Sequence, residues 1–292
     1  MLLITGANGQ LGRCFQHLAA QFPALDVHFA TSSELDITDK RSIKRFFQQY
    51  PVKWVINCAA YTAVDKAESE PDQAQKVNVL GVKYLAEACA EHGAKLVHFS
   101  TDYVYHNRHN LPFKEDEQVS PKGVYARTKL AGERAAMHVH PGGVMIIRTS
   151  WVYAREGHNF VNTMLRLGRE RGQVRVVCDQ IGSPTYAPDL AAAVFSIIDR
   201  TEKQEIPKEN TVGIWHYSNE GVASWYDFAC AIFEISGIAC KVEPIETIDF
   251  PTPAQRPPFS VLNKSKIKAA FGLAIPHWRE SLAACLGERI GS

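Results

Sequence analysis

Five short apolar runs, separated by longer segments with helical periodicity, constrain the fold of this 292-residue chain more than any other feature. Nearly continuous apolar runs of this length are typical of strands that are covered on both faces. Residues 40–50 and 72–92, between these runs, are predicted helices, the second starting after Pro71 and ending before Gly93. The alternation predicts an α/β fold of the Rossmann type, a doubly wound parallel sheet with right-handed crossovers. The predicted strands are residues 2–5, 27–30, 54–58, 96–100 and 144–149.

Composition excludes several classes of protein. The formal net charge is +1, too small to attract nucleic acid or an acidic membrane surface, so we expect a small-molecule ligand. The seven cysteines have no Cys-x-x-Cys pair, which argues against a disulfide framework and against a zinc site. No signal-peptide pattern is present, and no apolar run approaches the ~20 residues that span a bilayer. We therefore expect a cytoplasmic protein.

A glycine-rich turn follows the first predicted strand, with Gly6, Gly9 and Gly12 in "GANGQLG". Gly6 would permit a tight turn, Gly9 a close backbone approach to a pyrophosphate, and Gly12 close helix packing. The amino terminus of the next helix would then offer free N–H groups to phosphates. The spacing differs from the commoner Gly-x-Gly-x-x-Gly, and an ordinary strand-to-helix turn is the alternative.

Two later segments fit a dinucleotide at the same edge of the sheet. "LDITD" (35–39) follows the second strand, where Asp36 and Ile37 could hold an adenine ring. "NCAAYT" (57–62) ends the third strand in small residues that leave room for the ligand; tight packing of Ala59 and Ala60 is the alternative.

A proton donor is predicted from "YARTK" (125–129), which places Tyr125 and Lys129 four residues apart on one helix face. A lysine ammonium beside a phenol lowers the phenol's pKa from ~10, which makes Tyr125 a candidate general acid for carbonyl reduction. Thr101, in "STDYVY" (100–105), follows the fourth strand and therefore lies at the same sheet edge as the glycine turn. Its hydroxyl could polarise a substrate carbonyl.

These motifs, with others along the chain, resemble the extended short-chain dehydrogenases/reductases and, among them, the dTDP-4-dehydrorhamnose reductase family. The glycine turn and Tyr-x-x-x-Lys mark only the superfamily, whereas "YTAVDKAE", "RTSWVY" and "DQIGSPT" are narrower. The segments that carry the resemblance are "GANGQLG" (6–12), "AAYTAVDKAESEPDQA" (59–74), "HFSTDYVY" (98–105), "VYARTKLAGE" (124–133), "IIRTSWVYAREGHNF" (146–160), "DQIGSPTYA" (179–187), "SWYDFA" (224–229) and "PTPAQRPPFSVLN" (251–263).

The resemblance implies reduction of the C4 keto group of dTDP-4-dehydro-L-rhamnose by NADPH or NADH. Tyr125 would deliver the proton, Lys129 would hold the nicotinamide ribose, and Thr101 would orient the carbonyl. The implied cofactor-binding residues are Gly6, Asn8, Gly9, Gln10, Leu11, Gly12, Ser32, Asp36, Ile37, Cys58, Ala59, Ala60, Tyr61, Tyr125 and Lys129. The implied substrate-binding residues are Thr62, Val64, Asp102, Tyr103, Val104, Trp151 and Arg256.

Two of the substrate assignments have structural alternatives. Trp151 could form an apolar platform for a deoxysugar or could belong to the core. Arg256 could pair with the nucleotide diphosphate or could be a solvated loop residue.

After about residue 150 the alternation loosens, and glycines, prolines and short helical segments predict a second, smaller lobe. Residues 1–150 form an NAD(P)-binding Rossmann domain, to which a segment at roughly 185–215 returns. Residues 151–292 are mainly a smaller α/β substrate-binding lobe, interleaved with the first.

The sequence departs from the family at three positions. Some members bridge a dimer through magnesium held by glutamates, whereas Cys14 and Pro188 occupy those positions here. We therefore expect no metal, and either a monomer or a homodimer not mediated by magnesium. Ser32 stands where many relatives carry an arginine for the 2′-phosphate of NADPH, so the choice between NADPH and NADH stays open.

Two other functions remain as alternatives. One is a sugar-nucleotide epimerase or dehydratase on the same scaffold, although a dehydratase usually has an Asp-Glu pair after the threonine. The other is a non-catalytic regulatory subunit like the beta subunit of methionine adenosyltransferase. The presence of Thr101, Tyr125 and Lys129 together favours catalysis.

Overall fold

The central element is a six-stranded sheet with the strand order β10-β5-β4-β3-β1-β2, and every neighbouring pair in it is parallel. It is seen in a computed structural model that describes residues 1–107 and 110–290. The order reverses between β1 and β3, so ligand-binding loops converge where these strands end. This is the doubly wound α/β fold expected from the sequence. The strands are β1 (Leu2–Thr5), β2 (Val27–Ala30), β3 (Trp54–Asn57), β4 (Lys95–Thr101), β5 (Val144–Thr149) and β10 (Gly213–His216).

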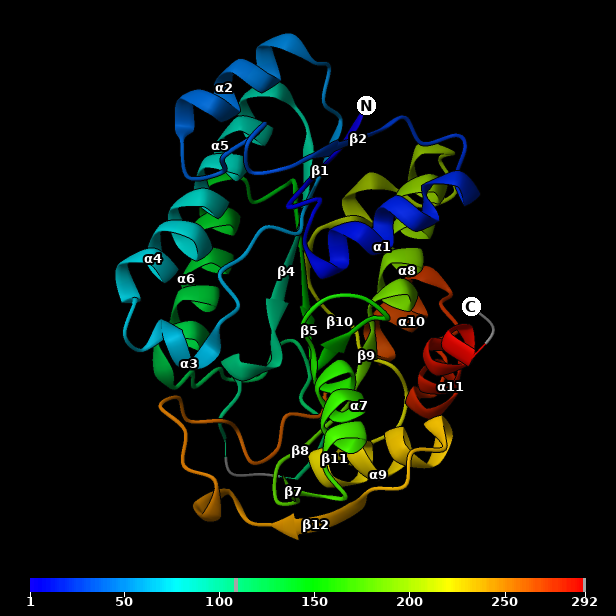
Figure 1. Cartoon of the computed structure of the whole chain (residues 1–292). Helices are drawn as coiled ribbons and strands as arrows, with labels where there is room; N and C mark the ends of the chain where they lie inside the picture. Colours follow the sequence, from blue (N-terminus) through cyan, green and yellow to red (C-terminus); the bar gives the residue numbers. More distant parts are fainter. Residues whose placement is uncertain (108–109, 291–292) are drawn as a thin grey trace.

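Helices cover both faces of the sheet (Figure 1). One face packs against α1 (Gln10–Leu18) and α8 (Ala187–Glu202), with Ile4, Val97 and Ile147 pointing into that core. The other face packs against α2 (Lys40–Gln49), α5 (Val82–His92) and α6 (Gly123–Val139). Burial on both faces explains why these strands are apolar throughout.

A second group of elements lies beyond the carboxyl ends of the strands, in the lower half of Figure 1. Its core contains side chains from three helices and from short strands that form two-stranded pairs. The helices are α7 (Phe160–Glu170), α9 (Trp225–Ser236) and α11 (Trp278–Ile290). The strand pairs are β6 (Val152–Tyr153) with β9 (Thr185–Tyr186), β7 (Gln173–Val177) with β12 (Lys241–Ile245), and β8 (Ile181–Gly182) with β11 (Ala223–Ser224). The remaining α-helices are α3 (Val64–Ala67), α4 (Pro71–Gln75) and α10 (Ser265–Phe271).

The helix predicted at 72–92 is divided into three parts. A π-helical turn, η2 (Lys76–Gly81), separates α4 from α5. The turn directs the buried Asn78 amide toward the loop after β3, where its Oδ1 accepts from the Tyr61 N–H (2.9 Å) and its Nδ2 donates to the Tyr61 carbonyl (3.1 Å). Single-turn π-helical insertions of this kind often occur near functional sites. No α-helix in the described ranges is both long and apolar enough to cross a bilayer.

Candidate active site

The glycine turn after β1 is too crowded for any side chain at two of its three glycines. Gly6 has φ +66°, and a Cβ there would lie 2.6 Å from the Ala59 nitrogen. A Cβ at Gly12 would lie 2.4 Å from the Gly6 carbonyl oxygen, so this glycine lets α1 pack directly on the turn. Gly9 is the exposed N-cap of α1 and provides no capping side chain for the first N–H groups of the helix. The turn therefore forms a cradle suited to a phosphate group.

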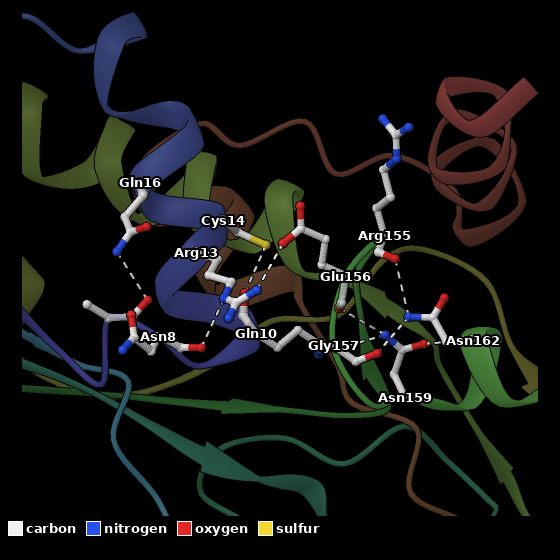
Figure 2. Close-up of polar contacts among 11 residues, drawn as sticks. Asn8, Gln10, Arg13, Cys14, Gln16, Arg155, Glu156, Gly157, Asn159 and Asn162 are labelled. Atoms are coloured by element: carbon white, nitrogen blue, oxygen red, sulfur yellow. Dashed lines mark hydrogen bonds and ion pairs between the residues drawn. The ribbon is translucent and has the colours of Figure 1, made fainter. Parts of the chain in front are cut away.

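Gln10 joins the start of α1 to the second lobe (Figure 2). Its Nε2 donates to the Val152 carbonyl (3.1 Å), and its Oε1 accepts from Nδ2 of Asn159 (2.8 Å). Arg13 pairs with Glu156 in the same loop (3.2 Å), although both side chains are about half exposed. Asn8 is exposed, and its carbonyl accepts from Nε of Arg13 (3.1 Å).

The loop after β2 contains hydroxyl groups and an acidic residue that forms a hydrogen bond with a histidine. Ser32 is exposed, and the neighbouring Glu34 is held by His28 at 2.6 Å. Asp36 is exposed and accepts hydrogen bonds from Thr38 within its own turn. The side chain of Ile37 is buried and packs into the hydrophobic core on this side of the sheet, which anchors the loop.

The loop after β3 runs beside the glycine turn. Cys58 donates its N–H to the Thr5 carbonyl (3.2 Å), and Ala59 donates its N–H to Oδ1 of Asn57 (3.1 Å). Cys58, Ala59, Ala60 and Tyr61 are all partly exposed, and Asn78 holds Tyr61 through its backbone. This loop and the glycine turn form adjacent walls at the point where the strand order reverses.

Thr101 and Tyr125 meet at the carboxyl end of β4. Thr101 is the last residue of this strand, and Tyr125 lies in the first turn of α6. Thr101 lies close enough to the phenol to lower its pKa, and the ring of Tyr103 packs edge-on against Tyr125 with 5.9 Å between the ring centroids. The hydroxyl of Thr101 also donates to Oδ1 of Asp102 (3.1 Å) and accepts from the Tyr103 N–H (3.1 Å). The predicted pair of hydroxyl groups is therefore assembled at one place.

Lys129 lies one turn further along α6 and is almost completely buried. Its Nζ donates to the Phe99 carbonyl (2.7 Å) and lies 3.3 Å from Nε2 of His98. Burial lowers the pKa of Lys129 to about 8, although Glu133 opposes that effect. The lysine is thus directed toward β4.

The expected lowering of the phenol pKa by the lysine is wrong for this geometry. Burial raises the pKa of Tyr125 to about 12, the nearby Thr101 lowers it, and the Asp102 carboxylate raises it. Desolvation of the phenolate outweighs the other effects, since the charged form loses solvation around this side chain.

The residues expected to line a sugar pocket fall into different environments. Thr62 is exposed and Val64 half-buried, both at the start of α3. Asp102 is 2% exposed, and its Oδ2 has no hydrogen-bond partner among the described residues. Val104 is completely buried in a cluster with Tyr105, Phe113, Leu130 and Leu262, which does not fit a side-chain role in a sugar pocket.

Trp151 is partly exposed and rigidly held. Its φ of +49° lies in the left-handed region that bulky residues rarely adopt, and such strain persists where the surroundings impose it. The indole stacks on Trp225, with centroids 3.6 Å apart and planes at 8°. A Cβ at Gly182 would lie 2.7 Å from the indole, so this glycine makes room for the ring.

Arg256 is not a solvated loop arginine. Its guanidinium makes two hydrogen bonds to the carboxylate of Asp65 in α3 (2.7 and 3.1 Å) and one to Thr252 (2.7 Å). This pair holds segment 252–256 against the first lobe. The adjoining cavity, about 380 Å³, lies beside the start of α6. Its lining is Glu68, Pro121, Lys122, Gly123, Arg127, Pro253 and Gln255.

Several buried polar residues around the site were not predicted. Asn57, His98 and Arg148 interrupt otherwise apolar strands, and this interruption is the signal that could have identified them. Arg148 makes a bidentate pair with Glu133 of α6, which also contacts the Ser100 hydroxyl. These residues fix α6 to β4 and β5 beneath the reacting groups.

The two departures from the magnesium-binding relatives have structural roles. Cys14 is buried, and its Sγ donates to the Gln10 carbonyl (3.2 Å). Pro188 lies in the first turn of α8. Within residues 1–107 and 110–290, no group of three or more histidine, cysteine, aspartate or glutamate side chains is arranged to hold a metal ion.

The parallel sheet, the glycine cradle at its switch point, and the Thr101–Tyr125 pair define a dinucleotide-binding α/β protein of the short-chain dehydrogenase/reductase type. The family model described as "RmlD substrate binding domain" matches residues 1–290. The chain belongs to this family.

Named relatives agree with this assignment over nearly the full length. A dTDP-4-dehydrorhamnose reductase from Aggregatibacter actinomycetemcomitans is 42% identical over 288 residues, covering 96% of each chain. The crystal structure of a dTDP-4-dehydrorhamnose reductase from Clostridium acetobutylicum superposes with a TM-score of 0.90 at 40% identity, covering 99% of each chain. A dTDP-4-dehydrorhamnose reductase from Bacillus anthracis, solved in complex with NADP, gives a TM-score of 0.91 at 37% identity over 98% of each chain.

Proposed function

We propose that this chain reduces the C4 keto group of dTDP-4-dehydro-L-rhamnose to give dTDP-L-rhamnose, with NADPH or NADH as the reductant and Tyr125 as the proton donor. The observation that carries the proposal is the contact of Thr101 with Tyr125 beside the glycine cradle. Relatives about 40% identical over nearly the full length bear the name of this reaction.

Tyr125 donates its proton to the substrate oxygen as that oxygen gains negative charge. Because the pKa of Tyr125 is raised to about 12, the phenol keeps its proton at neutral pH and is available as an acid. Thr101 lies next to the phenol, and when substrate binds its hydroxyl turns from Oδ1 of Asp102 to donate a second hydrogen bond to the substrate oxygen, which stabilises the developing charge. Lys129 binds the nicotinamide ribose from the buried side of α6.

The bound nicotinamide supplies the hydride. The chain holds the cofactor through the glycine cradle and the N–H groups of α1, with the loop after β3 along one side. At the adenosine end Ser32 is exposed, and its hydroxyl is able to bind either a ribose hydroxyl or a 2′-phosphate. Both NADPH and NADH therefore fit the loop after β2.

The sugar nucleotide lies between the two lobes. Trp151 offers an apolar ring to the deoxysugar, and Tyr103 packs next to the proton donor. Arg256 provides the cation for the diphosphate, exchanging one carboxylate partner for two phosphate groups. In this proposal residues 1–150, with the returning segment near 185–215, bind the cofactor, and residues 151–292 mainly bind the sugar nucleotide.

The reaction takes place in the cytoplasm under the same proposal. None of the seven cysteines, all of which lie in the described ranges, forms a disulfide, as is usual in a reducing compartment. The chain functions as a monomer, or as a homodimer that magnesium does not bridge, because Cys14 and Pro188 replace the carboxylates that such a bridge needs.

The test is to mix the protein with dTDP-4-dehydro-L-rhamnose and either NADPH or NADH, and to follow nicotinamide absorbance. We expect oxidation of the cofactor, and we expect Tyr125→Phe to lower kcat/KM by about 10²- to 10⁴-fold because the general acid is lost. Tyr84→Phe, on the outer helix α5, serves as the matched control and should retain activity. NADPH binding without turnover in the parent protein would support the regulatory-subunit alternative instead.

A further inference from the structure

A row of buried polar side chains crosses the sheet beneath the active site. Thr5, Asn57 and His98 are register partners on β1, β3 and β4, so their side chains point to the same face, toward α6. The Thr5 hydroxyl donates to Oδ1 of Asn57 (2.7 Å), and Nδ2 of Asn57 lies 3.1 Å from Nδ1 of His98. The row ends at Lys129, whose Nζ is 3.3 Å from Nε2 of His98. It therefore connects the glycine turn to the lysine of the site.

The backbone determines the orientation of every donor in this row. The Ala59 N–H can only donate, and it points at Oδ1 of Asn57 (3.1 Å). The other end of that amide must then be the NH₂ group, which donates to Nδ1 of His98. A neutral imidazole that accepts at Nδ1 carries its proton on Nε2, and burial lowers the pKa of His98 well below its usual value, so the ring is neutral. The Nε2–H consequently points at Lys129.

This orientation disfavours a charged lysine. An ammonium at Nζ would need a hydrogen-bond acceptor on this side, but it faces the Nε2–H donor of His98. A neutral amine at Nζ accepts from the imidazole N–H and still donates to the Phe99 carbonyl at 2.7 Å. We propose that Asn57 and His98 are positioning residues for Lys129, which aim an imidazole N–H at the lysine nitrogen and so weaken its hold on the proton. The proposal deepens the proposed function, since it concerns the lysine of the same site.

The other titratable groups around Lys129 do not account for a lowered affinity of this lysine for its proton. Tyr125 and Glu133 lie on its own helix, one turn before and one turn after it. Glu133 favours the ammonium, and its charge is already balanced by Arg148 of β5, which donates to Oε1 (3.1 Å) and Oε2 (2.7 Å) of the carboxylate. From β4, His98 is the titratable group in contact with Nζ, so the imidazole is the neighbour whose N–H opposes protonation.

Nuclear magnetic resonance tests the orientation of the row without any turnover. Long-range ¹H–¹⁵N spectra of histidine-labelled parent protein should show the His98 proton on Nε2. His216 provides an internal reference with the opposite tautomer, because its Nδ1 faces the Phe113 carbonyl and must donate (3.1 Å). A proton on Nδ1 of His98 would overturn the proposal.

Two variants test the effect on the lysine. Asn57→Asp keeps Oδ1 for Ala59 and Thr5 but presents a second acceptor to His98, which moves the imidazole proton to Nδ1. His98→Phe removes the N–H altogether. In ¹³C-lysine-labelled protein, the pH at which the Lys129 Cε resonance titrates should rise in both variants by about 1 unit or more. The resonance is assigned by its loss in Lys129→Met, and His28→Phe, at the exposed edge of β2, should leave its titration unchanged.

Folded variants in which Lys129 titrates as in the parent protein would show that the row is only structural. If neither variant folds, the tautomer of His98 in the parent protein decides the question. In the reductase assay, the basic limb of the pH profile should move in the same direction as the lysine titration. Absence of turnover in the parent protein would contradict the proposed function alone, because the resonance measurements do not depend on it.

Discussion

Asp102 is a buried carboxyl group at the edge of the site. It follows Thr101 at the end of β4, is 2% exposed, and has one carboxylate oxygen without a hydrogen-bond partner in the described part of the chain. Burial raises its pKa from 3.8 to about 7, although hydrogen bonds from Ser260 and Thr101 act in the opposite direction. A carboxyl group held in this way is protonated below neutral pH and costs stability when it ionises.

The sign of the pH dependence follows from the raised pKa. Asp102 contributes stability below the unfolded value of 3.8, and this contribution is lost as pH rises toward about 7, by roughly 4 kcal/mol at most. Asp102→Asn removes the ionisation, so its free energy of unfolding relative to the parent should increase by about 2–3 kcal/mol between pH 5 and pH 8. Urea unfolding at both pH values measures this, with the surface variant Asp249→Asn as the control. An equal difference at the two pH values would contradict the prediction.

Individual site residues could be predicted where a motif fixes their position on the chain. Thr101 and Tyr125 were placed at one sheet edge because a strand end and a helix start are readable from sequence, and the structure joins them. No role could be assigned to Asn57 and His98 from sequence. Their contact depends on the register between strands, and the two residues are 41 positions apart in the chain. The pKa of Tyr125 was predicted in the wrong direction, because spacing on a helix does not reveal burial or the contact of Lys129 with β4.

At the scale of elements, α6 is held unusually close to the segment before α5. Gly132 lies in the middle of α6, and a Cβ there would be 2.0 Å from the Asn78 carbonyl oxygen in the π-helical turn. The same turn directs the Asn78 amide to Tyr61 and to the Thr128 hydroxyl (3.2 Å). The close approach thus ties the helix of the proton donor to the loop after β3.

Gly132→Ala should therefore destabilise the protein, although alanine is favoured over glycine by about 1 kcal/mol in a helix interior. The new methyl group would force α6 away from Asn78, and overpacking of this kind typically costs about 1–3 kcal/mol. Gly287→Ala in α11 is the matched control, because a Cβ there meets nothing within 4 Å and should stabilise or leave the fold unchanged. Thermal unfolding of both variants checks this; a stabilised Gly132→Ala protein would show that the helices are not in close contact.

Element boundaries were largely predictable, since Pro71 and Gly93 mark the two ends of the second helical segment. The π-helical turn inside it was not, because its six residues are too few to establish a distinct periodicity. The parallel sheet could be predicted because apolar strands alternate with helices along the sequence. The strands β8 and β11 of the second lobe have two residues each, which is too short for a periodic pattern to be recognised.

In the molecule as a whole, polar side chains join the two groups of elements on both sides of the site. Gln10 connects the glycine turn to Val152 and Asn159, and Asp65 connects α3 to Arg256. The Asp65–Arg256 pair is partly exposed, with side chains 40% and 22% accessible, so the pair itself contributes little to stability. Because Arg256 lies beside Tyr103, we expect it to matter more for ligand binding than for folding.

An assay distinguishes the roles of Arg256 and Asp65. Arg256→Ala should raise KM for dTDP-4-dehydro-L-rhamnose about 10-fold or more with a smaller change in kcat, because a diphosphate contact is made equally in the ground and transition states. Asp65→Asn releases the same guanidinium without removing it, so KM should stay within about twofold and unfolding should change by about 1 kcal/mol or less. Steady-state kinetics at saturating NADPH measures both. Equal increases in KM would mean that Arg256 acts mainly by holding segment 252–256 against α3, since loss of either partner would then open the same contact.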